Sequence, residues 1–454
     1  MNQGNSYPNM TTQKILHPLH LALAVLCQST LHSNWPQWRG PLGTGEAPDA
    51  TPPLTWSESN NIAWKKEIPG QGHSTPIIWE DTVFLTSTQP TGPQLPPPPP
   101  QPPGAHNNVD ALRKHRFLVH SLDRKSGNLK WQTTVRFQRP SGSTHETGTW
   151  ASASPVTDGK KVYAFFGSDG LFCLDFEGKV LWEKQLGIMT VKHGHGEGAS
   201  PAIHGNTIVV NMDHEGQSSI VALDTTDGSE IWKINRDEPT SWSTPVIAYQ
   251  DTRPQAIVLG TNAIRSYSLE DGKTLWFCRG LSNNIVATPV HSQHTLYAGS
   301  SYDTRAILAI DTKDAEGDLT HTQHILWRSN QRPPYVPSPL LADGNLYYLR
   351  HYQNILTKRE GRTGKMPHPP IRLPGLLNIY ASPVAASGRI YISDQQGATL
   401  VLDQETTKPI QVNRLDEGIN ASLALAGDQL FIRGSKHLYC IQTTTTGSHP
   451  DNPK

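Results

Sequence analysis

The chain has 454 residues, and its 39 lysine and arginine residues balance 39 aspartate and glutamate residues. A protein that binds nucleic acid through phosphates needs a positive surface, and this composition provides none. We therefore expect no nucleic acid among its partners.

The N-terminal segment has the pattern of an export signal. Lys14 is followed by an interrupted apolar run, residues 15–26, and then by Cys27 and small polar residues. Such a run is typical of a secretory signal and is too short to span a bilayer stably. We predict a signal peptide over residues 1–33, a periplasmic or extracellular protein, and no transmembrane span. One alternative is a frayed apolar N-terminus. The other is a lipid anchor on Cys27, but acylation requires a small residue at the preceding position, where this chain has Leu26.

Eight units of forty-odd residues follow, and nearly all open with a small residue before proline. The prolines from Pro155 to Pro383 lie 46, 44, 44, 50 and 44 residues apart. This period fits one four-stranded blade of a β-propeller and is too long for a leucine-rich or ankyrin unit. The openings are Ser74-Thr75-Pro76, Ser154-Pro155, Ser200-Pro201, Ser243-Thr244-Pro245, Ala287-Thr288-Pro289, Ser338-Pro339, Ser382-Pro383 and the degenerate Ser422-Leu423.

The second half of most units carries leucine, an acidic residue, a glycine turn and then tryptophan. The acidic residue and glycine favour a hairpin turn, and the indole can reach between adjoining blades, where it buries a large apolar area. Scattered core tryptophans would not recur at one offset. We therefore expect a structural role for Trp64, Trp131, Trp182, Trp232, Trp276 and Trp327.

The eight units can close into a ring. The last unit, residues 420–441, supplies three strands, whereas residues 61–68 form a strand that has no blade. Pairing them removes both free edges, which would otherwise favour aggregation. We predict an all-β fold, an eight-bladed β-propeller of four-stranded antiparallel blades over residues 57–442, closed by an N-terminal strand after a strap at 34–56. We also expect a monomer.

Two segments interrupt this pattern. Residues 89–104 contain five consecutive prolines, Pro96 to Pro100, and fall between two strands of the first blade. Proline cannot continue a sheet ladder, so we expect an exposed polyproline loop. A tolerated surface insertion is favoured over a ligand for a proline-binding module. The polar tail, residues 443–454, is predicted to be disordered.

One face of the predicted ring collects the candidate site residues. It carries the lead-in loop before the first strand of each blade and the turn between the second and third strands. Aromatic residues lie on the same lead-in loops, at Trp150, Trp242, Tyr335 and Tyr380. The candidate ligand-binding residues are His145, Glu146, His193, His195, Glu197, Asp213, His214, Glu215, Asp303, Arg305 and His351.

A possible metal site lies within this face. His193, His195 and Glu197 alternate with glycines, so an extended loop would point all three side chains the same way. Two imidazoles and a carboxylate suit zinc or another divalent ion. The segment 213–215 would complete or orient the site, and His145 and His351 are not expected to converge with it. The alternatives are a pocket for a small molecule or peptide and a solvated polar loop.

These repeats resemble the pyrroloquinoline-quinone-type (PQQ-like) repeat propellers, and within them the BamB-like branch. The segment Asn34-Trp35-Pro36-Gln37-Trp38-Arg39-Gly40-Pro41 is similar to the opening of exported planctomycete-type propellers. The resemblance covers residues 34–442. It implies an eight-bladed propeller, and either a scaffold for envelope protein assembly or a quinoprotein dehydrogenase.

The resemblance implies that a quinoprotein enzyme covers its quinone with a disulfide between adjacent cysteines and binds calcium beside a catalytic aspartate. Cys27, Cys173, Cys278 and Cys440 are not neighbours, so we expect no PQQ and no cofactor except a possible divalent metal. The sequence also lacks a nucleophile elbow and a phosphate loop. We therefore predict a non-catalytic exported scaffold for an unknown protein or peptide partner. The alternative is a ligand-binding or metal-binding propeller, or a quinoprotein-type oxidoreductase, that uses the histidine-rich face.

Overall fold

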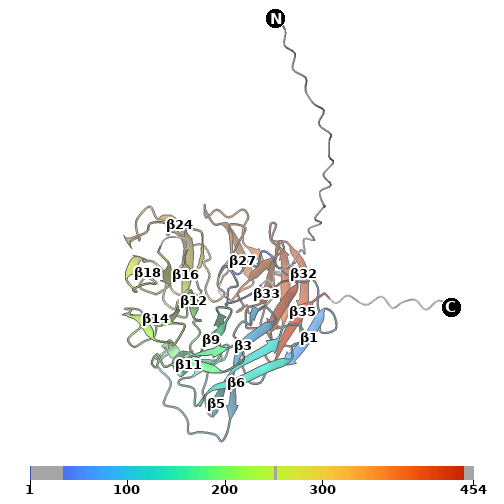
Figure 1. The fold of residues 1–454 in the computed structure, drawn as a ribbon. Coiled ribbons are helices and arrows are strands. Elements are labelled where there is room, and N and C mark those ends of the chain that lie inside the picture. Colours follow the sequence, from blue (N-terminus) through green and yellow to red (C-terminus); the bar gives the residue numbers. More distant parts are fainter. Residues whose placement is uncertain (2–33, 250–252, 351, 444–454) are drawn as a thin grey trace, which may run out of the picture. The chain divides into compact units, whose positions relative to one another are not determined.

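The structure is a computed structural model that describes residues 1, 34–249, 253–350 and 352–443. The predicted signal peptide, Cys27 and most of the predicted disordered tail lie outside the described residues. The described residues form eight blades, each built on a four-stranded antiparallel sheet, that follow one another around a ring in chain order (Figure 1). None of them belongs to a helix that is long and apolar enough to cross a membrane.

The first four blades follow the order of the chain from the axis outward. Their strands are β2 (Ile77–Trp79), β3 (Thr82–Thr91), β5 (Lys114–Asp123) and β6 (Leu129–Gln138) in blade 1; β8 (Val156–Thr157), β9 (Lys161–Phe165), β10 (Leu171–Asp175) and β11 (Val180–Lys184) in blade 2; β12 (Ala202–His204), β13 (Thr207–Met212), β14 (Ser219–Asp224) and β15 (Glu230–Asn235) in blade 3; and β16 (Val246–Ala248), β17 (Gln255–Val258), β18 (Ile264–Ser268) and β19 (Thr274–Cys278) in blade 4.

The second half repeats this pattern, except in the last blade. The strands are β20 (Val290–Ser292), β21 (Thr295–Ser300), β22 (Ala306–Asp311) and β24 (Ile325–Ser329) in blade 5; β25 (Leu340–Ala342), β26 (Asn345–Leu349), β27 (Ile355–Glu360) and β28 (Ile371–Arg372) in blade 6; β29 (Val384–Ala386), β30 (Arg389–Ser393), β31 (Ala398–Asp403) and β32 (Pro409–Arg414) in blade 7; and β33 (Ala424–Ala426), β34 (Gln429–Arg433), β35 (His437–Gln442) and β1 (Ile62–Glu67) in blade 8.

Burial within a blade explains the sequence pattern of its strands. The third strand of blade 3, β14, is buried at five of its six residues because it packs between the adjoining blades. The outer strand β15 has one fully buried side chain, Trp232, among exposed or half-buried neighbours. Strands that are covered on both faces therefore have continuous apolar runs, whereas outer strands alternate.

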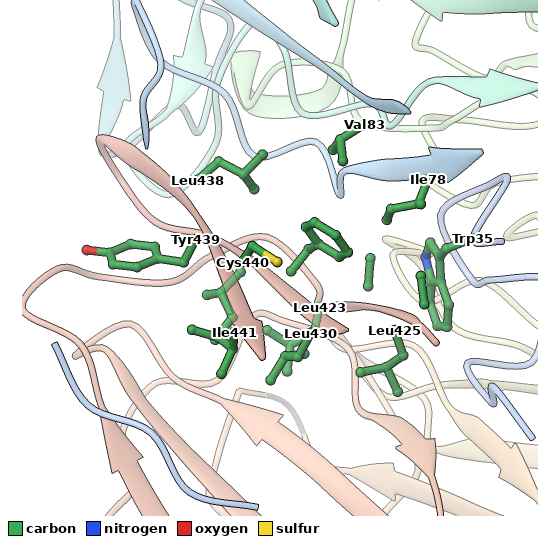
Figure 2. Packing of buried hydrophobic residues seen from close by; sticks show 14 of the residues in the cluster. Trp35, Ile78, Val83, Leu423, Leu425, Leu430, Leu438, Tyr439, Cys440 and Ile441 are labelled. Atoms are coloured by element: carbon green, nitrogen blue, oxygen red, sulfur yellow. The ribbon is translucent and has the colours of Figure 1, made fainter. Parts of the chain in front are cut away.

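The N-terminal strand β1 closes the ring, which confirms the predicted architecture. It pairs antiparallel with β35, and Trp64 lies opposite Cys440. The first strands of blades 1 and 8, β2 and β33, also contact each other. Figure 2 shows the buried core at this junction, where Ile78 and Val83 of blade 1 face apolar residues of blade 8.

The repeated tryptophans lie against the next blade. Trp232, for example, donates its indole N–H to the carbonyl oxygen of Leu269 at 2.9 Å, and its ring covers Gly272 in the hairpin turn of blade 4. Equivalent bonds to the following blade are made by Trp64, Trp131, Trp182 and Trp327.

Trp276 departs from this pattern. Its indole N–H donates to the Gln255 side chain of its own blade at 2.9 Å. A short added strand from the insertion of blade 5, β23 (Gly317–Asp318), pairs parallel with β19, with Gly317 in register with Trp276. A Cβ atom added at Gly317 would meet nothing within 4 Å, so Gly317 does not pack on the indole as the turn glycines of other blades do.

A belt of hydrogen bonds explains the small residue that opens each unit. The backbone N–H of one opening residue donates to the hydroxyl of the next, at 2.9–3.0 Å. The belt joins neighbouring blades from blade 1 to blade 8. Its members are Thr75, Ser154, Ser200, Thr244, Thr288, Ser338, Ser382 and Ser422.

The strap, residues 34–56, lies across the first strands of blades 1, 2, 6, 7 and 8. The guanidinium of Arg39, which is only 4% exposed, donates to the carbonyl oxygens of Pro339 and Pro383. Trp35 is fully buried and exchanges backbone hydrogen bonds with Ile78 (Figure 2). Further backbone bonds link the strap to Thr157, Leu341, Ala385 and Gly427. The strap therefore closes one end of the axis.

The proline-rich insertion begins within a strand and not in a loop. Gln89, Pro90 and Thr91 continue β3 and pair with β5. Pro90 is tolerated because β2 has already ended, so β3 has a neighbour on one side only at this point. Residues 98–102 then help to line a cavity of about 440 Å³ with the ring of Trp150. The predicted exposed loop is therefore partly packed against the blades.

Candidate functional site

A cleft of about 620 Å³ lies on the axis of the propeller. The lead-in loop of every blade contributes to its lining, and the strap adds Trp38. From blade 1 to blade 8 in order, one such lining residue per blade is His73, Ser154, Ser200, Trp242, Asn284, Tyr335, Tyr380 and Asn420. Because the lining comes from eight separate loops, its chemistry can vary while the strands keep the ring intact.

Aromatic side chains form one part of the lining. Tyr352 stacks on Tyr380 with ring centroids 5.5 Å apart and planes inclined by 4°. Tyr302 stacks on Tyr335 at 6.0 Å, and Tyr302 is 50% exposed. These rings present apolar faces beside polar groups, an arrangement that suits the binding of a peptide or an amphipathic ligand.

Three histidines converge at another part of the lining. One ring nitrogen from each of His106, His145 and His195 lies within 4.8 Å of the other two. The centroid of the His195 ring is 4.7 Å from that of His106 and 4.8 Å from that of His145. The sequence-based expectation that His145 would not converge was wrong, and His106 was not among the predicted site residues.

Backbone pairing between three segments places these histidines. The short strands β4 (Asn108–Val109) and β7 (Thr144–His145) form a two-stranded sheet in which Asn108 lies opposite His145. The N–H of His145 donates to the carbonyl oxygen of His195 at 3.0 Å. The insertion of blade 1 and the lead-in loops of blades 2 and 3 are thereby held together. A pairing this distant in sequence leaves no periodic signal in the chain.

The surroundings of His145 and His195 favour neutral rings. Burial is the largest cause that lowers the pKa of His195 to about 4, and the neighbouring histidines lower it further. Burial also lowers the pKa of His145. The Nδ1 atom of His195 lies 3.0 Å from Oδ1 of Asn108, and that of His106 lies 2.9 Å from the carbonyl oxygen of Gly104.

The structure does not bring the predicted ligands His193, His195 and Glu197 together. The carboxylate of Glu197 accepts hydrogen bonds from the backbone and hydroxyl of Ser168, and burial raises its pKa to about 7. The alternation argument fails because the loop is not extended. Residues 192–194 form a 3-10 turn, η2 (Lys192–Gly194), in which His193 has a φ of 55°. His193 lies beside the three histidines, with its ring centroid 5.4 Å from that of His195.

Other predicted residues lie in different places. Asp213 is buried and forms an ion pair with Arg236 at 2.7 Å. His214 and Glu215 accept backbone N–H groups at 3.1 Å and line a separate depression, so they do not complete the predicted metal site. Asp303 and Arg305 line another depression. Glu146 does line the axial cleft. His351 lies outside the described residues.

The cleft does not provide the cysteine lid that the quinoprotein resemblance implies. Cys173, Cys278 and Cys440 are free and buried in the blades, and the described lining of the cleft contains no cysteine. Burial raises the pKa of Cys173 to about 12. These thiols therefore act as small core side chains.

Four-stranded blades, indoles that pack on the next blade, a closing N-terminal strand and an axial cleft define a PQQ-like repeat propeller. The model for the family described as outer membrane protein assembly factor BamB matches residues 115–367 and 217–448. The chain belongs to this family. No curated protein sequence matches it significantly.

Solved structures with this fold include a BamB protein and two dehydrogenases. BamB from Moraxella catarrhalis has 15% identity and a TM-score of 0.56, with 84% of this chain and 99% of that chain covered. A europium-containing methanol dehydrogenase has 12% identity and a TM-score of 0.61, with 89% and 90% covered. Quinohemoprotein alcohol dehydrogenase from Comamonas testosteroni has 9% identity and a TM-score of 0.61, with 93% and 82% covered. At these identities the likeness shows the fold alone.

Proposed function

We propose that this protein is an exported, non-catalytic propeller that binds a segment of another protein in its axial cleft. Membership of the BamB family supports a scaffold role, and suggests outer-membrane protein assembly as its setting. The N-terminal sequence pattern supports export.

The axial cleft is the observation that carries this proposal. Its volume of about 620 Å³ and its lining by all eight blades suit a short peptide segment. Tyrosine and tryptophan side chains dominate many protein-binding surfaces because they add a large contact area and lose little conformational entropy. Asn107 and Asn284 also line the cleft, and side-chain amides of this kind bind a peptide backbone.

Selection from a random peptide library on the purified protein tests the proposal. We expect enriched peptides to bind one site with micromolar affinity. The change Tyr302→Ala should weaken binding about tenfold, since exposed aromatic anchors often contribute more than 1 kcal/mol.

Tyr249→Ala is the matched control. Tyr249 is 54% exposed and follows β16 in the turn to β17, outside the cleft lining. Peptide binding that is equally sensitive to both substitutions, or insensitive to Tyr302→Ala, would contradict a binding site in the cleft.

A further inference from the structure

We propose that His106, His145 and His195 bind one divalent transition-metal ion, for which Zn²⁺ is the test ion, at the wall of the axial cleft. This site is independent of the proposed peptide binding. It differs from the set that the sequence suggested, because it contains His106 and His145 and excludes Glu197.

The ligand chemistry identifies the class of ion. Imidazole nitrogen suits zinc, copper and nickel, whereas calcium and magnesium require oxygen ligands. Three protein ligands on zinc leave the fourth position open, and here this position is accessible from the cleft. The bound ion would therefore retain a water molecule or accept one donor atom from a ligand.

The observed spacing is close to that of a ligand set. Zinc–nitrogen bonds of about 2.1 Å place tetrahedral ligands about 3.4 Å apart. One nitrogen of each ring lies within 4.8 Å of the other two, so side-chain movements of about 1 Å would bring the three nitrogens to zinc-binding distance. His106 has room for such a movement because its side chain is exposed.

Hydrogen bonds to Nδ1 orient these rings. The Nδ1–H group of His106 can donate to the carbonyl oxygen of Gly104, and that of His195 can donate to Oδ1 of Asn108. Because the proton of each neutral ring is then on Nδ1, Nε2 carries no proton and is available to a metal. Metal-binding histidines commonly have a hydrogen-bond partner of this kind.

The partner of His145 requires one adjustment. Its Nδ1 lies 2.8 Å from Oγ1 of Thr147 and also accepts the backbone N–H of Thr147 at 3.2 Å. Metal binding through Nε2 would place the proton on Nδ1, which then donates to the hydroxyl.

The site explains a role for the insertion in blade 1. Asn108 donates its amide N–H to the carbonyl oxygen of His193 at 2.7 Å, and Glu146 donates its backbone N–H to the carbonyl oxygen of Asn107 at 2.8 Å. These bonds fix the insertion to the lead-in loops of blades 2 and 3. They bring a third imidazole to the two that the loops already hold.

A zinc titration tests the proposal. The full chain is purified without a histidine tag, stripped with a chelator and titrated with Zn²⁺ against a chromophoric chelator. We expect one ion per chain with a submicromolar dissociation constant. Each of His106→Ala, His145→Ala and His195→Ala should weaken binding at least 100-fold, more than the roughly 10-fold to 100-fold effect of losing an orienting partner. The metal-free melting temperatures of these variants should stay close to that of the native protein.

Matched variants separate this site from nonspecific binding and from the alternative ligand set. His321→Ala, at an exposed histidine outside the cleft lining, should not change the affinity. Glu197→Gln should also leave zinc binding intact, and Asn108→Ala should weaken it about tenfold. An affinity weaker than about 100 µM, or His106→Ala with native affinity, would overturn the proposal. The titration contains no peptide, so a negative result leaves the proposed function unaffected.

Discussion

The backbone N–H of Ser338 donates to the hydroxyl of Ser382 at 2.9 Å, and these two residues open neighbouring blades. Both are buried. The bond therefore satisfies a donor that water cannot reach, and the same relationship joins the blades from the first to the last.

Removing one hydroxyl from this belt should destabilise the propeller. Ser382→Ala leaves the N–H of Ser338 without its acceptor, and we expect the free energy of unfolding to fall by about 1–3 kcal/mol. Ser382→Thr should be milder, since Thr244 and Thr288 fill equivalent positions. Urea denaturation measures both changes. An alanine variant as stable as the native protein would show that the belt contributes nothing.

Closure of the ring gives a second prediction. A chain that lacks residues 1–68 loses β1 and exposes the edge of β35, so we expect it to aggregate. A chain that lacks only residues 1–33 should remain soluble with an unchanged melting temperature. Light scattering compares the two. A soluble, monomeric product of the longer deletion would contradict closure by β1.

Packing of an indole on a turn glycine gives a third prediction. A Cβ atom added at Gly272, where φ is +72°, would lie 2.7 Å from the Trp232 ring. Gly344 has a similar φ of +68°, but an added Cβ there meets nothing within 4 Å. Both alanine variants carry backbone strain, and only Gly272→Ala also overpacks the blade junction. It should therefore be less stable than Gly344→Ala by about 1–3 kcal/mol in chemical denaturation.

Acid sensitivity gives a fourth prediction. Burial lowers the pKa of His115 from an ordinary value of 6.5 to about 4, and that of His120 to about 3. Below pH 6.5 the unfolded chain binds protons that the folded protein does not, so stability falls as the pH decreases towards 4. The slope for each histidine should be about 1.4 kcal/mol per pH unit.

His115→Phe isolates one of these contributions. The phenyl ring can retain the contact with Trp150, which the imidazole approaches at a centroid distance of 4.7 Å. Denaturation between pH 7.5 and 4.5 should then show a shallower dependence than in the native protein. An identical dependence would exclude His115 as a source of acid sensitivity.

Quinone binding gives the fifth prediction. Because the described cleft lining lacks a cysteine lid, protein mixed with PQQ and calcium should show no bound-cofactor absorbance and no alcohol-dependent dye reduction. Stoichiometric binding at micromolar affinity would overturn the non-catalytic assignment, and dye reduction with an alcohol would indicate a dehydrogenase.

The repeats explain how much of the fold the sequence predicted. Each blade leaves a local and recurring pattern, so the blade number and the pairing of residues 61–68 with the last unit could be inferred, and the structure confirms them. Trp276 is an exception, because its indole N–H donates to Gln255 of its own blade and an insertion of the next blade pairs beside its strand.

The candidate site was less predictable because it depends on contacts between loops that do not repeat. The positive φ values of Gly194 and Gly196 turn the loop that carries His193 and His195. The alternation of side chains along an extended loop therefore gave the wrong direction for the Glu197 side chain. The place of His106 follows from the pairing of Asn108 with His145, which no periodicity encodes.

The strap has a consequence for the shape of any ligand. Because residues 34–56 cross the first strands of five blades and contribute Trp38 to the lining, the strap obstructs passage along the axis. We therefore expect that a polypeptide is not threaded through the propeller. A bound segment would either end inside the cleft or turn sharply and leave beside its own incoming strand, so we expect this propeller to prefer chain termini and hairpin tips over the middle of an extended chain.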